Sequence, residues 1–322
     1  MKRLLTFAAA AIPLMAVLAA FGCGDNRSDT VIQGEATVPV ALVDARRGFK
    51  SVLRPAGNRK EAVPQPPPNV FTKITYPSPV GPLAGYLSVD PRDGQKHPAI
   101  VWITGGDCNS IGDMWSEAPP SNDQTASAFR KAGIITMFPA LRGGNDNPGV
   151  KEGFLGEVDD VLAAADFLSQ QPNVDANRIY LGGHSTGGTL VLLVAESSDR
   201  FRAVFSFGPA SDVRGYPDEF LPFDTSNPRE SELRSPVYWL TSIRSPVFVI
   251  EGMGGNHDSL QEMARGSANP QVHFLAVKGA NHFDVLAPVC ALLAGKILRD
   301  VGNAGGIALT EPELNDAFAR SR

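Results

Sequence analysis

Cysteine and histidine are scarce in this chain of 322 residues, which contains only three of the former and five of the latter. They do not recur at the close spacing that metal-binding motifs use, so the sequence predicts no metal site. No Gly-x-Gly-x-x-Gly turn and no phosphate-loop lysine follows an expected strand, so we also expect no nucleotide and no other cofactor.

Positive charge is in short supply as well. There are 29 lysines and arginines against 34 aspartates and glutamates, which gives a net charge of −5. No basic stripe is present, and this excludes nucleic acid as an expected partner. The hydrophobic content of 43% is ordinary for a globular chain with a sizeable core.

The long apolar run of the chain lies at its N-terminus, where Lys2 and Arg3 precede the stretch 4–20. This run is shorter than the roughly 20 residues of a membrane-spanning helix, and the pattern is typical of a secretory signal peptide, here residues 1–22. Residues 18–23 resemble a bacterial lipoprotein signal, although Ala20 stands where that pattern prefers leucine. The resemblance implies a lipid on Cys23 and an exported protein anchored to a bacterial membrane, facing the periplasm or the cell exterior. An ordinary signal peptide with an incidental cysteine is the alternative.

The other two cysteines, Cys108 and Cys290, are expected to be free buried thiols, with a disulfide as the alternative. Residues 23–69 have few periodic runs and end in the proline-rich stretch 64–68, which predicts a tether with one short element near 38–43. We expect the catalytic domain to occupy residues 70–322.

Within that domain, apolar runs alternate with helical stripes and turns. Expected strands lie at 71–76, 83–89, 99–103, 134–138, 178–181, 203–207, 247–250 and 272–277, and expected helices at 125–132, 157–170, from 189, within 229–243, and at 310–319. Strands that alternate with helices predict an α/β fold, a mostly parallel sheet covered by helices on both faces.

One turn carries the strongest chemical signal, the sequence Gly182-Gly183-His184-Ser185-Thr186-Gly187-Gly188 between an apolar strand and an apolar helix. In that context Gly-x-Ser-x-Gly is a nucleophile elbow, which holds a serine hydroxyl exposed where a base reaches it. Ser185 is therefore the candidate nucleophile.

A serine nucleophile needs a base and an acceptor that orients the base. Of the five histidines, His282 lies just beyond the last strand, where a loop reaches back over Ser185, and it is the candidate base. His257 is the competitor, whereas the side chain of His184 is expected to point away. Asp258, in the loop after the next-to-last strand, is the candidate acid, with Asp212 as the alternative.

The oxyanion that forms during acyl transfer needs backbone donors already in place. The N–H of Thr186 is one by its position after the nucleophile, and the second is expected from the loop 104–108. Two adjacent glycines precede Asp107 there, and the sequence leaves open whether Gly106 or Asp107 donates.

Together these residues resemble an α/β-hydrolase, and more narrowly the catalytic domain of the prolyl oligopeptidase family. The resemblance covers about 70–299 and rests on the elbow, on 174–179, on Phe-Pro-Ala-Leu-Arg-Gly-Gly at 138–144, on 234–236 and 243–246, and on Gly-Ala-Asn-His-Phe at 279–283. It implies the triad Ser185, Asp258 and His282. It also implies a serine peptidase that acts through an acyl-enzyme on small peptides.

The chain departs from that family in two respects. Residues 24–69 are too few for the β-propeller that the family's peptidases usually carry, and Thr104 stands where the family has tyrosine or histidine. A carboxylesterase acting on small esters is therefore the alternative, and a non-catalytic binding lipoprotein on the same fold is the alternative of another class.

Overall fold

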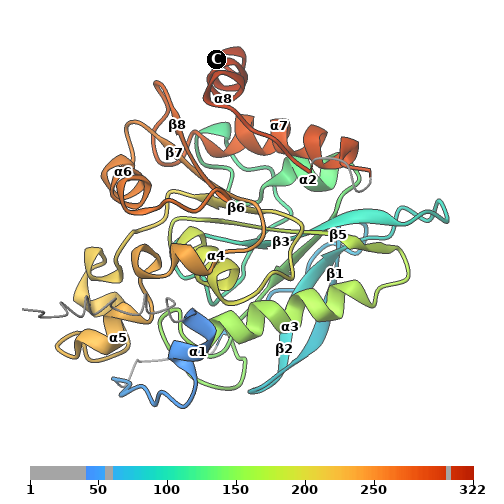
Figure 1. Ribbon diagram of the computed structural model, residues 1–322. Helices are drawn as coiled ribbons and strands as arrows, with labels where there is room; N and C mark the ends of the chain where they lie inside the picture. Colours follow the sequence, from blue (N-terminus) through green and yellow to red (C-terminus); the bar gives the residue numbers. More distant parts are fainter. Residues whose placement is uncertain (1–40, 55–60, 302–305) are drawn as a thin grey trace, which may run out of the picture. The chain divides into compact units, whose positions relative to one another are not determined.

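The computed structural model describes residues 41–54, 61–301 and 306–322 (Figure 1). Their centre is one eight-stranded sheet in the order β1-β2-β4-β3-β5-β6-β7-β8. The strands are β1 Phe71–Ser78, β2 Gly81–Ser88, β3 His97–Ile103, β4 Ile135–Pro139, β5 Val174–His184, β6 Val204–Phe207, β7 Val247–Gly252 and β8 Val272–Val277.

The sheet is parallel from β4 to β8, while β2 pairs antiparallel with both β1 and β4. The expected hairpin of β1 and β2 and the expected mostly parallel sheet are confirmed. Because parallel strands end at one edge of a sheet, the residues that follow β3, β5, β6, β7 and β8 gather at that edge.

Helices cover both faces of the sheet, as expected for α/β architecture (Figure 1). Side chains of α3, α4 and α6 pack in one core cluster and those of α2, α7 and α8 in the other. The helices are α1 Leu42–Arg46, α2 Ser127–Lys131, α3 Glu157–Ser169, α4 Thr186–Ser197, α5 Pro228–Glu232, α6 His257–Gly266, α7 Leu286–Arg299 and α8 Glu311–Arg320.

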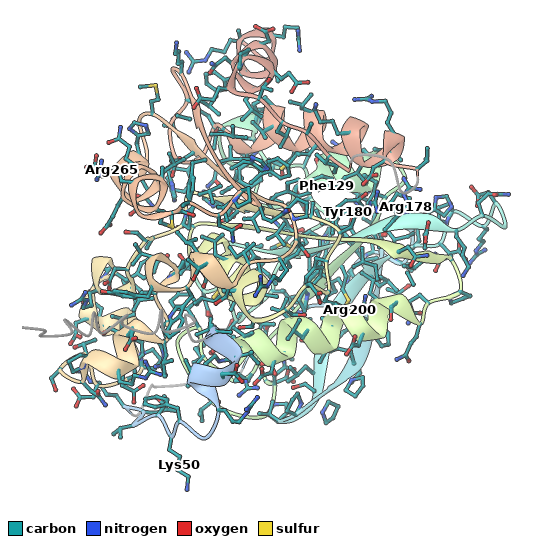
Figure 2. The ribbon with its side chains drawn as sticks, viewed as in Figure 1. Lys50, Phe129, Arg178, Tyr180, Arg200 and Arg265 are labelled. Carbon is teal, nitrogen blue, oxygen red and sulfur yellow. The ribbon has the colours of Figure 1, made fainter. Side chains whose placement is uncertain are left out.

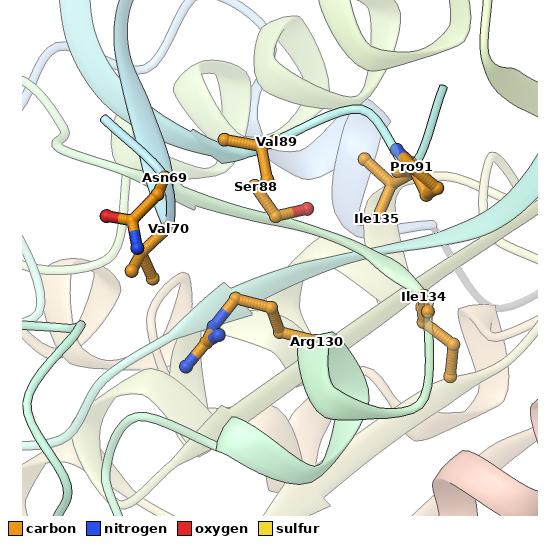
Figure 3. Close-up of a pocket in the computed structure, with 9 residues that line it drawn as sticks. Asn69, Val70, Ser88, Val89, Pro91, Arg130, Ile134 and Ile135 are labelled. Atoms are coloured by element: carbon orange, nitrogen blue, oxygen red, sulfur yellow. The ribbon is translucent and has the colours of Figure 1, made fainter. Parts of the chain in front are cut away.

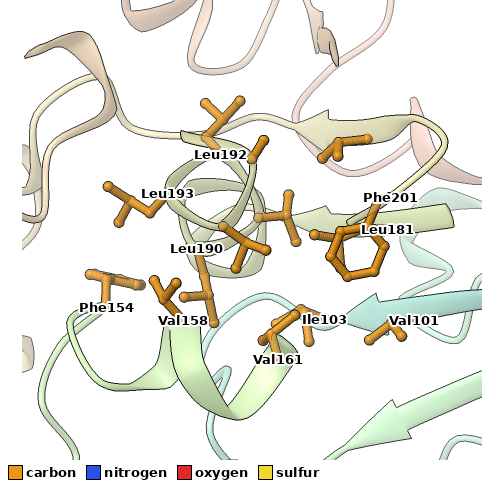
Figure 4. Close-up of a cluster of buried hydrophobic side chains, with 14 of the residues drawn as sticks. Val101, Ile103, Phe154, Val158, Val161, Leu181, Leu190, Leu192, Leu193 and Phe201 are labelled. Atoms are coloured by element: carbon orange, nitrogen blue, oxygen red, sulfur yellow. The ribbon is translucent and has the colours of Figure 1, made fainter. Parts of the chain in front are cut away.

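Alternation along each strand divides the core between the two faces. In β3, Val101 and Ile103 pack with α3 and α4, whereas Ile100 and Trp102 face the other cluster. Figure 4 shows side chains of the first cluster packed around α4. Phe129 and Tyr180, labelled in Figure 2, are fully buried in the second. Two apolar layers thus hold β5 and α4, and with them the turn that joins them, in the middle of the domain.

Some elements differ from their expected form. The helix expected within 229–243 is α5 followed by two short 3₁₀ turns, because Pro236 interrupts it. The capping box that was expected to open the last helix is present, with Thr310 and Glu313 bonded reciprocally. Helix α6 occupies residues that the sequence suggested as a loop.

The expected tether is packed on the domain wherever the structure describes it. In the N-terminal strap, which we define as residues 41–54, Leu42 is fully buried and its N–H donates to Ser242 Oγ at 3.3 Å. Arg46 Nη2 donates to the carbonyl oxygen of Leu155 at 2.6 Å, and Leu53 pairs with Phe223 in an isolated β-bridge. Residues 61–69 also contact the domain, through Pro64, whose carbonyl oxygen accepts from Tyr86 Oη at 2.8 Å.

The compact domain therefore begins well before residue 70. The signal segment, Cys23 and the first half of the short element expected at 38–43 lie outside the described residues. In the part of the chain that is described, no helix has the length and apolar character needed to cross a membrane.

Candidate active site

The turn after β5 has the strained geometry of a nucleophile elbow. Ser185 has φ of 56° and ψ of −116°, a conformation that a side chain disfavours, and its N–H donates to the carbonyl oxygen of Phe207 at 2.8 Å. A Cβ at Gly183 would lie 2.6 Å from the backbone oxygen of Gly187, and a Cβ at Gly187 would lie 2.3 Å from that of Ile103. Only glycine fits at positions 183 and 187, two residues before and two residues after the serine.

His282 lies in the loop after β8, and its imidazole is oriented by a buried carboxylate. Its Nδ1 is 2.8 Å from Oε2 of Glu251, a residue of β7 whose side chain is fully buried. Glu251 also accepts from the N–H of Gly252 at 2.6 Å and from that of Asn256 at 3.0 Å. These bonds hold the carboxylate in place. Because Glu251 binds Nδ1 of His282, the other ring nitrogen, Nε2, is left for another partner.

The chain brings this imidazole to the same place as the nucleophile. Gly208 directly follows Phe207, which binds the Ser185 amide, and a Cβ at Gly208 would lie 2.5 Å from His282 Cε1. The ring of His184, the neighbour of Ser185, has its centroid 4.5 Å from that of His282. Ser185 and His282 thus lie near each other at the edge of the sheet where β5, β6 and β7 end.

The carboxylate at His282 corrects the expectation from sequence, which favoured Asp258 and then Asp212. Asp258 is an exposed residue in the first turn of α6, because the helix begins at His257 and turns it outward. Asp212 is bound by Arg214 and by Tyr238 Oη. Although burial acts to raise the pKa of Asp212, the hydrogen bonds from Arg214 lower it.

His257, the competitor of His282 as the base, and His97 belong to other elements of the fold. His257 stands at the start of α6, and His97 stands at the opposite end of the sheet, where its Nε2 is 3.0 Å from Asp93 Oδ1. Cys108 and Cys290 are buried free thiols, as expected. Among the described residues, no group of three or more histidine, cysteine and acidic side chains could hold a metal ion.

The loop after β3 lies against the elbow and offers backbone donors. Thr186 Oγ1 donates to the carbonyl oxygen of Gly106 at 2.9 Å, which ties this loop to the start of α4. Within the described residues, the N–H groups of Gly106, Asp107 and Thr186 have no protein acceptor. The N–H of Gly105, in contrast, donates to Gln124 Oε1 at 3.1 Å. The arrangement supplies free amides beside Ser185, where an oxyanion would form.

The side chain of His184, which the sequence predicts to point away at the elbow, contacts Gln124 and the loop of His282. Its Nε2 is 2.8 Å from the carbonyl oxygen of His282, and its Nδ1 is 2.7 Å from Gln124 Nε2. Burial, together with the nearby His282, lowers the pKa of His184 to about 4. His184 is therefore neutral at physiological pH.

A separate cavity of about 210 Å³ lies at the opposite edge of the sheet (Figure 3). Its lining includes Arg130, Ile134 and Ile135, which precede or begin β4, so it opens near the amino ends of the parallel strands. None of the candidate site residues lines this cavity, so it is not part of the candidate site.

Comparisons with known proteins agree with the fold. The sequence pattern of the prolyl oligopeptidase family matches residues 120–258. An uncharacterized peptidase of Bacillus subtilis (strain 168), YtmA, is 28% identical over 195 residues, which is 54% of this chain and 70% of that protein.

Solved structures give the same fold at lower identity. A puromycin hydrolase superposes with a TM-score of 0.58 and 18% identity over 75% of this chain and 41% of its own. An esterase of Pyrobaculum calidifontis superposes with a TM-score of 0.52 and 18% identity over 72% of this chain and 86% of its own. The chain thus spans about two fifths of the length of puromycin hydrolase.

The fold, the elbow and these matches together define the class: the chain has the α/β-hydrolase fold, with a nucleophile elbow after β5. Within that class, its resemblance to the catalytic domain of the prolyl oligopeptidase family is confirmed.

Sequence reasoning missed Glu251 and Gln124. Glu251 ends the run Val-Phe-Val-Ile-Glu, and a carboxylate at the end of a buried strand was a usable signal, because such a group needs a partner. Gln124 lies in the turn between the 3₁₀ segment Pro120–Asn122 and α2, and nothing in the sequence distinguishes it from a surface glutamine.

Proposed function

We propose that this chain is a serine peptidase that cleaves peptide or amide bonds through an acyl-enzyme, with Ser185 as nucleophile, His282 as general base and Glu251 as the acid that orients it. The observation that carries the proposal is the 2.8 Å contact of His282 Nδ1 with buried Glu251, beside the strained turn of Ser185. The matches to a peptidase family and to a Bacillus peptidase support peptide substrates.

In this mechanism Ser185 Oγ attacks the substrate carbonyl while His282 Nε2 takes its proton. The negative charge that develops on the carbonyl oxygen is met by the N–H of Thr186 and by that of Gly106 or Asp107. His282 then gives the proton to the leaving amine, and water attacks the acyl-enzyme by the same route in reverse. Glu251 stabilises the imidazolium that forms in each step.

The assignment is tested with a fluorophosphonate probe, which forms a covalent bond with an activated serine. The probe should label the wild-type protein and should not label Ser185→Ala. Failure of folded wild-type protein to react would favour the other class of function, a non-catalytic binding lipoprotein on a hydrolase fold.

Ester hydrolysis is the second candidate function. It is favoured by the match to an esterase of similar extent, 86% of whose length the chain covers, and by the departure at Thr104. A panel of short-chain p-nitrophenyl esters, peptide anilides and small peptides, with Ser185→Ala as the blank, separates the two. Larger kcat/KM values for anilides and peptides would support the peptidase, and turnover restricted to esters would support the carboxylesterase.

We also propose that the protein is exported and held at a bacterial membrane by lipid on Cys23. The support is the basic start, the apolar stretch 4–20 and the cysteine that follows it. The enzyme would then act on peptides outside the cytoplasm.

A further inference from the structure

His184 and Gln124 form a chain of hydrogen bonds that joins the three loops of the candidate site. The amide of Gly105 donates to Gln124 Oε1 at 3.1 Å, and Gln124 Nε2 is 2.7 Å from His184 Nδ1. His184 Nε2 in turn is 2.8 Å from the carbonyl oxygen of His282. The oxyanion loop, the elbow and the loop of the base are thus linked in series.

The donors and acceptors of this chain have one consistent assignment. Gln124 Oε1 faces an N–H, so the other end of its amide is the NH₂ group, which can only donate. His184 Nδ1 must therefore accept, and the proton of the neutral ring is on Nε2, directed at the carbonyl oxygen of His282. A proton on Nδ1 instead would break both the contact with Gln124 and the contact with the carbonyl oxygen of His282.

The surroundings hold this arrangement in place. His184 is 1% exposed, and its ring packs against those of His282 and Phe283, with centroid separations of 4.5 and 5.6 Å. Gln124 is held by its own backbone oxygen, which accepts from Trp102 Nε1 at 3.1 Å, and by Asn122, whose Oδ1 accepts from its Nε2 at 2.9 Å. The titratable groups that face His184 are His282 and, behind that ring, Glu251.

We propose that His184 and Gln124 are positioning residues: Gln124 selects the Nε2–H tautomer of His184, and His184 then holds the loop of His282 at the distance from Ser185 that proton transfer requires. This inference rests on the proposed function, because it gives the network a role in catalysis. Neither residue touches the reacting atoms, so both act through His282 and the loop of Gly105.

Two substitutions of His184 test the assignment of donors and acceptors in this series of hydrogen bonds. In His184→Gln the terminal amide reaches the place of Nε2 and retains a donor for the His282 carbonyl, whereas in His184→Asn the amide reaches only the place of Nδ1 and that donor is lost. We expect kcat to fall by roughly 10- to 100-fold in His184→Asn with KM little changed, because a small displacement of a catalytic group has a large kinetic effect. His184→Gln should retain several times more kcat, and His97→Asn, at the far edge of the sheet, serves as the matched control.

The rates are taken per active site, counted by fluorophosphonate labelling, so that a fraction of misfolded protein does not enter kcat. Equal losses in the two His184 variants, a smaller loss in His184→Asn than in His184→Gln, or no loss in either would overturn the inference.

A measurement that needs no turnover separates this inference from the proposed function. Two-bond ¹H–¹⁵N spectra of the wild-type protein, with His184→Gln to assign the signal, should show His184 as the neutral Nε2–H tautomer at pH 7. In Gln124→Leu only the His282 carbonyl still favours that tautomer, so the fraction of the Nδ1–H form should rise. A neutral Nδ1–H form, or an imidazolium at pH 7, would overturn the inference even if Ser185 reacts. Failure of Ser185 to react, with the Nε2–H form present, would count against the proposed function alone.

Discussion

The imidazole of His282 and the carboxylate of Glu251 are 2.8 Å apart, although Glu251 belongs to strand β7 and His282 to the loop after β8. Two neighbouring parallel strands thus supply two members of the proposed triad. Glu251 accepts from two backbone amides as well, so its position does not depend on the histidine alone. This relationship leads to the first prediction.

Replacing Glu251 by Gln should lower kcat/KM by about 10³-fold or more, because an amide no longer stabilises the imidazolium or fixes the tautomer of His282. Asp258→Asn, the variant suggested by sequence alone, should change kcat/KM by less than about 2-fold. The measurement is steady-state hydrolysis of the best ester or anilide substrate. A large loss in Asp258→Asn together with a small one in Glu251→Gln would return the acid to Asp258.

Gly208 offers a steric test of the same site. An alanine Cβ there would lie 2.5 Å from both His282 Cε1 and Glu251 Oε2, and the backbone has φ of +56°. We expect Gly208→Ala to reduce kcat by about 100-fold because it displaces the imidazole. Gly215→Ala, seven residues further on, meets nothing within 4 Å and should leave the rate within about 2-fold. Circular dichroism should show both variants folded, and comparable rates would refute the placement of His282.

His184 predicts a pH dependence of stability. Its pKa is about 4 in the fold and 6.5 in the unfolded chain, so the unfolded state binds more protons between these values. This residue's contribution is complete above pH 6.5 and is lost as the pH falls toward 4. From the linkage relation its full size is on the order of 3 kcal/mol. Urea unfolding of the wild-type protein and His184→Gln at several pH values should show the free-energy difference between them changing in this window. A difference that is constant with pH would contradict the assignment.

The N-terminal strap predicts a stability effect far from the site. Arg234 and Glu230 form an ion pair with both side chains fully buried, and each also bonds to Ser51 of the strap. Arg234→Met leaves Glu230 buried without its partner and should lower the free energy of unfolding by about 3–5 kcal/mol. Arg47→Met, which removes an exposed pair with Asp44 on the strap, should cost less than about 1 kcal/mol. Equal effects of the two substitutions in denaturant titrations would disprove this role.

The lipid proposal has a direct chemical test. Cells that express the full chain and are grown with labelled palmitate should incorporate the label into the wild-type protein and not into Cys23→Ala. Cys290→Ala is the matched control, because that thiol is buried and free. Equal labelling of the wild type and Cys23→Ala would remove the anchor.

The elbow and His282 were predictable because each is marked by local sequence. Gly183 is required by a contact with Gly187 inside the strand-turn-helix unit, and Gly187 by a contact with Ile103 of the neighbouring strand β3. Continuous apolar runs similarly predicted β3 and β7, which are buried on both faces and whose side chains divide between two core layers.

Other features depend on contacts between distant residues. The partner of Glu230 in the strap is Ser51, 179 positions away, and no local pattern in the strap indicates it. Asp258 was chosen as the acid because it follows β7 in the chain order serine, acid, histidine. The structure differs because α6 begins early enough to carry Asp258 outward. The role of Gln124 likewise depends on its meeting His184, 60 positions later in the chain.

The packing of the strap also limits where the enzyme could work. Were lipid attached at Cys23, 18 peptide steps would separate it from Ala41, where the strap begins, with a maximum span of roughly 60 Å. The strap of such an enzyme could lie no further than that from the bilayer, so the active site would be confined to a layer of solution whose depth is that span plus the width of the domain.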